Sequence, residues 1–180
     1  TKLFPKTIGI AGTHGKTTTT SMVSSVFLAA NLDPTIQVGA VLELLGSNYR
    51  VGKSPYLLIG ACEYKDSFLN FHQESAIVLN IDNDHLDYFK NMDNMEKSYQ
   101  EYVSKLPANG VLVLNKEDVR CQKLADFTKA KVITVGKTNA DWTYDNVSYD
   151  EEGYPSFDVY YQNTFQKRLF LRVTGEYNIL

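Results

Sequence analysis

One stretch near the N-terminus decides the fold: residues 7–31 read TIGIAGTHGKTTTTSMVSSVFLAAN. Residues 7–11 are a short β-prone run, and Gly-Thr-His-Gly follows it. From residue 16 to residue 31, apolar side chains recur at the spacing of an amphipathic helix. The stretch therefore predicts a strand, a glycine loop and a helix in that order, which is typical of an α/β fold.

Apolar runs and helical patterns alternate through most of the remaining chain. Four runs are nearly continuous, as strands buried on both faces of a sheet are: residues 56–62, 76–81, 111–114 and 132–135. Helical patterns cover residues 94–106 and 118–130. This alternation predicts a mainly parallel sheet with helices on both faces. Aromatic-rich runs at residues 141–149, 157–162 and 165–173 predict a small antiparallel β extension over about residues 141–173.

The composition is that of an ordinary globular protein. The 180 residues are 43% hydrophobic, and 18 Lys and Arg against 21 Asp and Glu leave a net charge of −3. Basic runs suited to nucleic acid or an anionic membrane surface are absent from the sequence, and so are apolar runs of the ~20 residues that a membrane helix needs. Cys62 and Cys121 lie outside any metal-ligand spacing, so we expect two free thiols, with Cys62 packed rather than nucleophilic. We expect a cytoplasmic protein that binds neither nucleic acid nor membrane.

The strongest chemical signal is the glycine loop at the start of the predicted helix. Backbone N–H groups of such a loop can surround a phosphate, a lysine ammonium can reach the terminal phosphates, and the next hydroxyl can ligate the Mg²⁺ that accompanies ATP. A standard P-loop has a further glycine where this chain has Ile10, so the loop is a shortened form. The loop consists of Gly12, Thr13, His14, Gly15, Lys16, Thr17 and Thr18.

Two polar segments follow predicted strands and are expected at the same edge of the sheet as the glycine loop. Residues 82–87 read DNDHLD, and in them His85 is flanked by carboxylates that suit a metal ligand. The alternative is a solvated loop with His85 exposed. Glu63 follows the strand at residues 56–62 and could reach Mg²⁺ or a water on it, the alternative being a surface salt bridge. We expect His72 at the surface.

These motifs resemble those of the Mur ligases, ATP-dependent amide-forming enzymes of bacterial peptidoglycan synthesis. The resemblance rests on GTHGKTTTT at residues 12–20, ACEYKDSFL at 61–69, AIVLNIDNDHLDYF at 76–89 and GEYNIL at 175–180. It implies that residues 1–180 are the central ATP-binding domain of a longer three-domain enzyme. A uridine-nucleotide-binding domain would precede this domain and a Rossmann-like amino-acid domain would follow it.

The resemblance also implies a reaction and roles for individual residues. The enzyme would join L-alanine to UDP-N-acetylmuramate through an acyl phosphate, with both substrates held mainly by the flanking domains, so that the isolated fragment is inactive. Residues 12–18 would hold the ATP phosphates, and Asn178 would contact adenine. Lys16 and His85 would act in catalysis, and Thr17, Glu63 and His85 would ligate Mg²⁺.

Two positions depart from the family pattern. Gly60 stands where the family has its usual metal-binding glutamate, 25 residues before the metal-ligating His85, so Glu63 or water would substitute, or Mg²⁺ is bound poorly, or the residue was altered. Tyr177 stands where the family generally has histidine. Gly60 therefore leaves a nucleotide-binding module without turnover open as an alternative. The related murein-peptide ligase also stays open, because the resemblance places the determinants of substrate specificity in the flanking domains.

Overall fold

The strand that precedes the glycine loop lies in the middle of the sheet. The computed structural model describes residues 3–180. In it, β1 (Lys6–Ala11) pairs in parallel with β4 (Tyr56–Gly60) on one side and with β5 (Ser75–Val78) on the other. The sheet has ten strands in the order β10-β9-β8-β7-β6-β5-β1-β4-β2-β3. The expected α/β class with a mainly parallel sheet is confirmed.

The parallel part of the sheet extends to both sides of β1. Beyond β5 lie β6 (Val111–Asn115) and β7 (Lys131–Gly136), and beyond β4 lies β2 (Thr35–Leu42), each parallel to its inner neighbour. The edge strand β3 (Ser47–Arg50) pairs antiparallel with β2. The sequence patterns predicted neither β2 nor β3. β4 and β5 end at Gly60 and Val78, two and three residues earlier than expected, because the chain turns there into the loops at the carboxyl ends of the strands.

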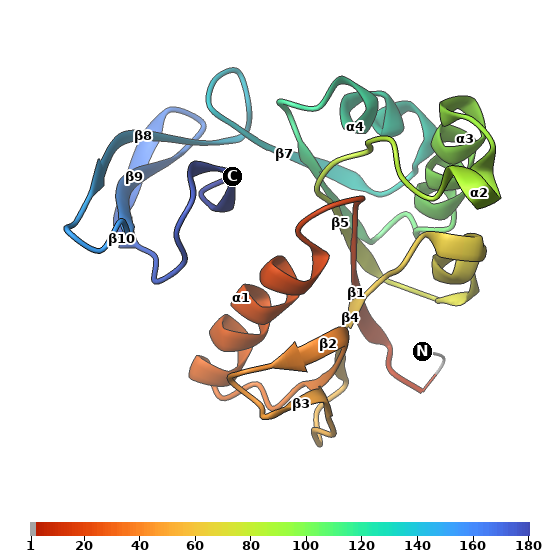
Figure 1. Cartoon of the computed structure of the whole chain (residues 1–180), viewed down its shortest axis with the longest axis horizontal. Coiled ribbons are helices and arrows are strands. Elements are labelled where there is room, and N and C mark those ends of the chain that lie inside the picture. Colours follow the sequence, from red (N-terminus) through yellow and green to blue (C-terminus); the bar gives the residue numbers. More distant parts are fainter. Residues whose placement is uncertain (1–2) are drawn as a thin grey trace.

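Helices cover both faces of this sheet, as expected (Figure 1). α1 (Lys16–Ala29) lies on one face and α3 (Met92–Ser104) on the other, together with shorter elements. These are η1 (Tyr64–Asn70), α2 (Leu86–Phe89), α4 (Val119–Lys123) and η2 (Leu124–Phe127), of which η1 and η2 are 3-10 helices. The helix predicted over residues 118–130 is thus two short helices. Asn91 caps α3, since its side chain accepts a hydrogen bond from the Asn94 N–H at 2.9 Å.

Each face of the sheet has its own apolar core. On the α1 face, Ile36, Val38 and Leu58 are buried against α1. On the α3 face, the stacked rings of Phe68 and Tyr102 lie within a larger cluster. Fully burying one such large side chain contributes roughly 1.5–3 kcal/mol. The two cores hold the strand ends, and therefore the loops that leave them, in fixed positions.

The predicted β extension is present as an antiparallel meander. It consists of β8 (Trp142–Tyr149), β9 (Pro155–Tyr161) and β10 (Thr164–Phe170), drawn in blue beyond β7 in Figure 1. β8 joins the main sheet by two parallel residue pairs with β7. A small core of its own includes Tyr144, Phe157 and Ile179, the last of which follows the 3-10 helix η3 (Glu176–Asn178).

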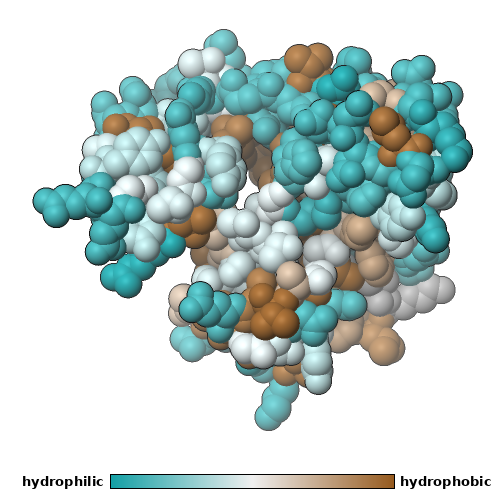
Figure 2. Space-filling view, in the orientation of Figure 1, coloured by the Kyte–Doolittle hydropathy of each residue, from teal (hydrophilic) through white to brown (hydrophobic). Residues whose placement is uncertain are grey.

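The surface carries few large apolar groups on the face shown in Figure 2, where brown residues form small separate patches among teal ones. Val41 on β2 is 70% exposed, and Leu44 in the following turn is 52% exposed. Among residues 3–180, no helix has the length and apolar character that crossing a membrane requires.

Candidate functional site at the carboxyl ends of the strands

The glycine loop leaves β1 at the carboxyl edge of the sheet and is clamped there by Asn80. The Thr13 N–H donates to the Asn80 carbonyl at 3.0 Å, and the His14 N–H donates to Asn80 Oδ1 at 2.7 Å. The Asn80 amide donates back to the His14 carbonyl at 3.0 Å. Sequence reasoning missed Asn80, although a polar residue just after a buried strand at this edge was an available signal.

The two glycines of the loop are required by its geometry. Gly12 has φ 138°, and a Cβ there would lie 3.0 Å from the Leu79 Cβ and 3.2 Å from the Asn80 backbone nitrogen. Gly15 has φ 86° and is the N-cap of α1, with no side chain capping the helix. The N–H groups of the first helical turn therefore lack a side-chain acceptor and suit an anion.

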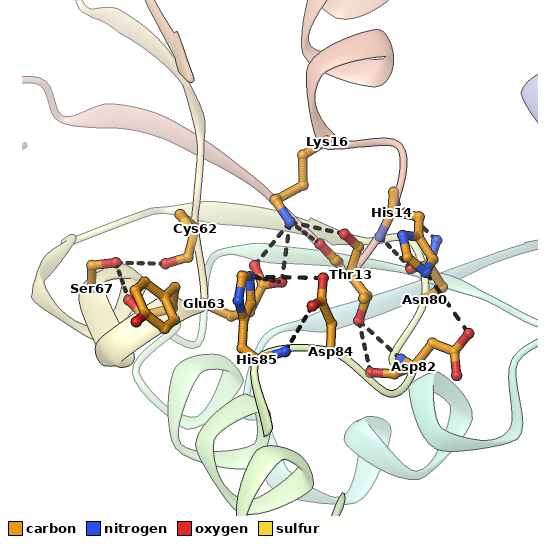
Figure 3. Close-up of polar contacts among 12 residues, drawn as sticks. Thr13, His14, Lys16, Cys62, Glu63, Ser67, Asn80, Asp82, Asp84 and His85 are labelled. Carbon is orange, nitrogen blue, oxygen red and sulfur yellow. Dashed lines mark hydrogen bonds and ion pairs between the residues drawn. The ribbon is translucent and has the colours of Figure 1, made fainter. Parts of the chain in front are cut away.

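Lys16 points back into this loop rather than out to solvent. Its ammonium donates hydrogen bonds to the Gly12 carbonyl at 2.5 Å, to the Thr13 carbonyl at 3.1 Å and to Glu63 Oε1 at 3.1 Å. Glu63 Oε2 lies 2.9 Å from the same nitrogen. Figure 3 shows Lys16, Glu63 and His85 converging on one point, beside Thr13.

Glu63 is a buried residue, so its interpretation as a surface salt bridge is wrong. Its side chain is 0% exposed, and its Oε2 atom accepts no hydrogen bond among the described residues although it is ion-paired with Lys16. Beyond the end of β4, burial alternates from one residue to the next: Ala61 is buried, Cys62 is exposed and Glu63 is buried. The expectation that Cys62 is packed is therefore wrong as well, while both cysteines are free thiols as predicted.

His85 faces Glu63 and has a left-handed backbone with φ 51°. Its Nε2 atom lies 4.0 Å from Glu63 Oε1 and 3.8 Å from Asp84 Oδ2, and its ring is 4.7 Å from the ring of Tyr64. The His85 side chain is 32% exposed, so it is neither buried nor simply solvated. The structure thus brings Lys16, Glu63 and His85 together, as a shared sheet edge predicted.

A set of hydrogen bonds ties the segment that carries Glu63 to α2 and α3. The Tyr64 hydroxyl donates to Asp87 at 3.0 Å, and the Tyr88 and Ser98 hydroxyls both donate to Asp66. The carboxylate that each tyrosine contacts raises the pKa of its phenol. Lys65 and Asp66 have φ of 53° and 55°, an uncommon conformation for consecutive non-glycine residues. No sequence pattern predicted these hydrogen bonds.

α3 contributes two buried tyrosines to the region of the site. Tyr99 is fully buried, and burial raises the pKa of its hydroxyl, with the charge of Glu63 adding to the effect. Tyr102 packs its hydroxyl against Gly9, where a Cβ would collide with it. Neither hydroxyl has a hydrogen-bond partner among the described residues. The buried Tyr99 ring therefore lies close enough to Glu63 for the two groups to interact electrostatically.

The remaining predicted site residues have different surroundings. Thr13 Oγ1 accepts from the Asp82 N–H at 2.9 Å, and exposed His14 lies 3.8 Å from Asp82 Oδ2. Thr17 is exposed and Thr18 partly exposed on the first turn of α1. Asn178 donates to the Thr174 carbonyl at 2.7 Å, so its hydrogen bond links it to its own segment rather than to the glycine loop. His72 is exposed, as expected.

The residues present fit a magnesium ion that also contacts phosphate. Among residues 3–180 no group of three or more His, Cys, Asp and Glu side chains could hold a metal by itself. Mg²⁺ is usually held by one or two carboxylates together with substrate phosphates and water. The Glu63 Oε2 atom, buried and accepting no hydrogen bond, is a suitable oxygen, and His85 lies beside the same carboxylate.

Gly60 is the last residue of β4 and leaves room on the α1 face of the sheet. A Cβ there would meet Thr20 Oγ1 at 3.7 Å and the Val38 Cα at 3.8 Å, both ordinary contact distances. A side chain is therefore sterically possible at this position, next to the glycine loop.

Comparisons with known proteins identify the family of this fold. Residues 59–180 match the family described as Mur ligase middle domain. The chain is 42% identical over 173 residues to a UDP-N-acetylmuramate–L-alanine ligase of Caldanaerobacter subterraneus subsp. tengcongensis and 44% identical over 173 residues to one of Clostridium acetobutylicum. Each alignment covers 96% of this chain, which spans 38% of the length of these curated relatives.

A solved structure extends the likeness to the fold. The UDP-N-acetylmuramate:L-alanyl-gamma-D-glutamyl-meso-diaminopimelate ligase from Neisseria meningitides superposes with a TM-score of 0.84 at 28% identity, covering 96% of this chain and 57% of that one. The match to the family covers more than half of the chain and includes Glu63 and His85. The chain therefore belongs to the Mur ligase family.

Proposed function

We propose that this chain is the ATP-binding domain of a cytoplasmic UDP-N-acetylmuramate–L-alanine ligase of peptidoglycan synthesis. Residues 1–180 would be its central domain, with two further domains completing the enzyme. The observation that carries the proposal is the meeting of Lys16, Glu63 and His85 beside a glycine loop at the opening of α1. The names of the curated relatives support the choice of L-alanine and UDP-N-acetylmuramate as substrates.

In the reaction, the substrate carboxylate attacks the γ-phosphorus of ATP and the bond to the ADP oxygen breaks. The acyl phosphate then reacts with the L-alanine amine, which forms the amide, releases phosphate and loses a proton. Such phosphoryl transfer depends on positioning and charge stabilisation rather than on covalent help from the protein. Residues 12–18 hold the phosphates, mainly through the N–H groups at the start of α1 because those of Thr13 and His14 are bonded to Asn80, and Lys16 stabilises charge on the transferred phosphoryl group. Mg²⁺ held by Thr17, Glu63 and His85 would neutralise further phosphate charge.

The adenine would lie near the C-terminal segment. Asn178 is in η3, and the neighbouring Tyr177 ring is 80% exposed, so it can offer a face to a base. A pocket of about 590 Å³ lies beside this segment, lined in part by Lys137, Tyr144 and Glu176. These residues belong to or adjoin the β extension, which gives that part of the chain a role in nucleotide binding.

A second candidate function is nucleotide binding without turnover. Gly60 favours it, because this position has room for a side chain but supplies no carboxylate to a metal. Murein-peptide ligation is a further alternative within the family, supported by the name of the solved relative at 28% identity. In the full-length enzyme, phosphate release that requires both UDP-N-acetylmuramate and L-alanine would support the ligase over both alternatives.

Calorimetry with ATP and Mg²⁺ tests the nucleotide site directly. We expect this chain to bind ATP in the presence of Mg²⁺, and Lys16→Met to weaken binding by about a factor of ten or more, as loss of a charge-assisted contact does. Lys129→Met is the matched control, because Lys129 is exposed. An absence of ATP binding by the unaltered chain, with and without metal, would refute the proposed site.

A further inference from the structure

The Lys16 ammonium is surrounded by oxygen atoms of the protein itself. The Gly12 and Thr13 carbonyls lie 2.5 and 3.1 Å from Nζ, and the two Glu63 oxygens lie 3.1 and 2.9 Å from it. An ammonium has three N–H donors, and all three are occupied by these contacts. Lys16 therefore has to give up protein partners before it can bind a phosphate.

Glu63 depends on that ammonium for its charge balance. Its side chain is 0% exposed, and within residues 3–180 the one other basic side chain paired with it is His85, whose Nε2 atom lies 4.0 Å from Oε1. A carboxylate buried without a cation is strongly disfavoured. When Lys16 turns away, another cation has to take its place beside Glu63.

We propose that Glu63, with the Gly12 and Thr13 carbonyls, forms a cation site that the Lys16 ammonium and a divalent metal ion occupy alternately. The proposal rests on the proposed function, because a nucleotide phosphate is what draws Lys16 out. The Lys16 side chain is 21% exposed and Lys16 is the first residue of α1, so it lies beside the N–H groups that would hold the phosphate. His85 is positioned to add a nitrogen ligand to the metal beside Glu63.

This exchange couples the binding of metal and nucleotide. Without nucleotide the metal has to displace an ammonium that makes four close contacts, so the site is blocked by its own lysine. With nucleotide the lysine is engaged by phosphate, and the carboxylate is available to the metal. By linkage, each ligand then strengthens the binding of the other by the same factor.

Removing Lys16 should therefore improve metal binding when no nucleotide is present. Mn²⁺ is the probe, since its free concentration can be counted by electron paramagnetic resonance. We expect Lys16→Met to bind Mn²⁺ about tenfold more tightly than the unaltered chain, within the usual range of coupling between sites. The double variant Lys16→Met/Glu63→Gln should lose that gain, and the control Lys129→Met should behave like the unaltered chain. Equal Mn²⁺ affinity of Lys16→Met and the unaltered chain, or a gain that survives in the double variant, would overturn the proposal.

A second measurement covers the case in which Lys16→Met does not fold. With a non-hydrolysable ATP analogue bound, the unaltered chain should hold Mn²⁺ in a ternary complex, whereas Glu63→Gln should retain the analogue but release the metal about tenfold more readily. Equal metal retention by the two proteins would contradict the exchange. If the unaltered chain binds ATP with Mg²⁺ and Lys16→Met still gains no Mn²⁺ affinity, the exchange is wrong while the nucleotide site stands.

Discussion

The polar edge of the main sheet consists of the glycine loop, η1 and the segment before α2. Contacts between residues far apart in the chain hold the polar edge together, whereas local turns connect the strands of the β8–β10 extension. Lys16 and Glu63 are 47 positions apart, and Thr13 and the Asp82 N–H are 69 apart. β9 and β10, by contrast, are separated by a two-residue turn at Gln162 and Asn163. The polar edge therefore exists only when the main sheet is assembled.

The two regions also differ in where they use left-handed backbone. In the extension such residues are Asn146, Gln162 and Asn163, at an irregularity of the β8–β9 pairing or in a tight turn, where asparagine is well tolerated. At the polar edge they are Lys65, Asp66 and His85, held by hydrogen bonds and ring contacts to neighbouring elements. The left-handed residues near the candidate site thus differ from those of the extension in being held by contacts to other elements, as is common where a structure positions reacting groups.

The largest expected effect on stability comes from breaking the ion pair between Lys16 and Glu63. Lys16→Met leaves the buried Glu63 carboxylate without its main cation, and breaking a buried pair in this way costs about 3–5 kcal/mol. Urea denaturation at neutral pH should show that loss in the free energy of unfolding. Lys129→Met should change it by less than about 0.5 kcal/mol, as surface substitutions do. A loss below about 1 kcal/mol for Lys16→Met would mean that Glu63 finds another partner.

The second-largest effect is expected from the hydrogen bonds that Asp66 accepts. Asp66→Asn removes the charge that accepts from the Tyr88 and Ser98 hydroxyls, so we expect a loss of about 1–2 kcal/mol in the free energy of unfolding. Because the same contacts hold η1, ATP binding measured by calorimetry should weaken as well. Glu151→Gln in the β8–β9 turn is a suitable control, since Glu151 is exposed, lies in the extension and does not line the pocket beside η3. Equal effects of the two substitutions on ATP affinity would erase the distinction between the two regions.

Gly60→Glu adds a charge to the polar edge without removing a contact. A side chain fits there at ordinary distances from Thr20 and Val38, and its carboxylate would supply an oxygen ligand close to the glycine loop. In the full-length enzyme we expect Mg²⁺ affinity to rise about tenfold, which is about 1.4 kcal/mol. The Mg²⁺ dependence of phosphate release measures it, with Gly60→Ala as the control for the side chain alone. An unchanged or weaker metal dependence of Gly60→Glu would contradict this expectation.

The sequence predicted the local parts of this structure and could not predict its distant contacts. β1, the glycine loop and α1 are consecutive, and periodicity together with two glycines specifies them. β2 was missed because its alternation is short: Ile36 and Val38 are buried, but Gly39 and Ala40 beyond them are exposed. The clamp of Asn80 on the loop depends on the parallel pairing of β1 with β5, which no local pattern encodes.

Within the candidate site, it was easier to predict which residues come together than how exposed each side chain is. Residue type and the expected parallel direction of the strands were enough to place Lys16, Glu63 and His85 at one edge. Whether Glu63 is buried depends on which face of the continued strand it occupies, and that follows from alternation only when the end of β4 is known. The contrast between buried Glu63 and exposed Cys62, its immediate neighbour, shows how one position changes the outcome.

The smallest expected effect concerns the join between β7 and the extension, where Asp141 accepts hydrogen bonds from the Thr134 N–H and hydroxyl, both at 2.8 Å. These bonds hold the pKa of Asp141 below its ordinary value of 3.8. A carboxyl with a lowered pKa in the folded state contributes stability above its unfolded pKa, and the contribution is lost as the pH falls through the folded pKa. Asp141→Asn should therefore remove a small part of the acid sensitivity of unfolding below pH 3.8.

Thermal unfolding followed from pH 7 down to pH 3 would measure this part, with Glu151→Gln as the matched control, because Glu151 is exposed in the β8–β9 turn. ATP affinity at neutral pH should be the same in Asp141→Asn and the unaltered chain, since Asp141 bonds Thr134 in β7 and does not line the pocket beside η3. A loss of ATP affinity in Asp141→Asn would instead show that the extension has to be held against β7 for the nucleotide to bind. That result would make the extension and the polar edge one functional unit.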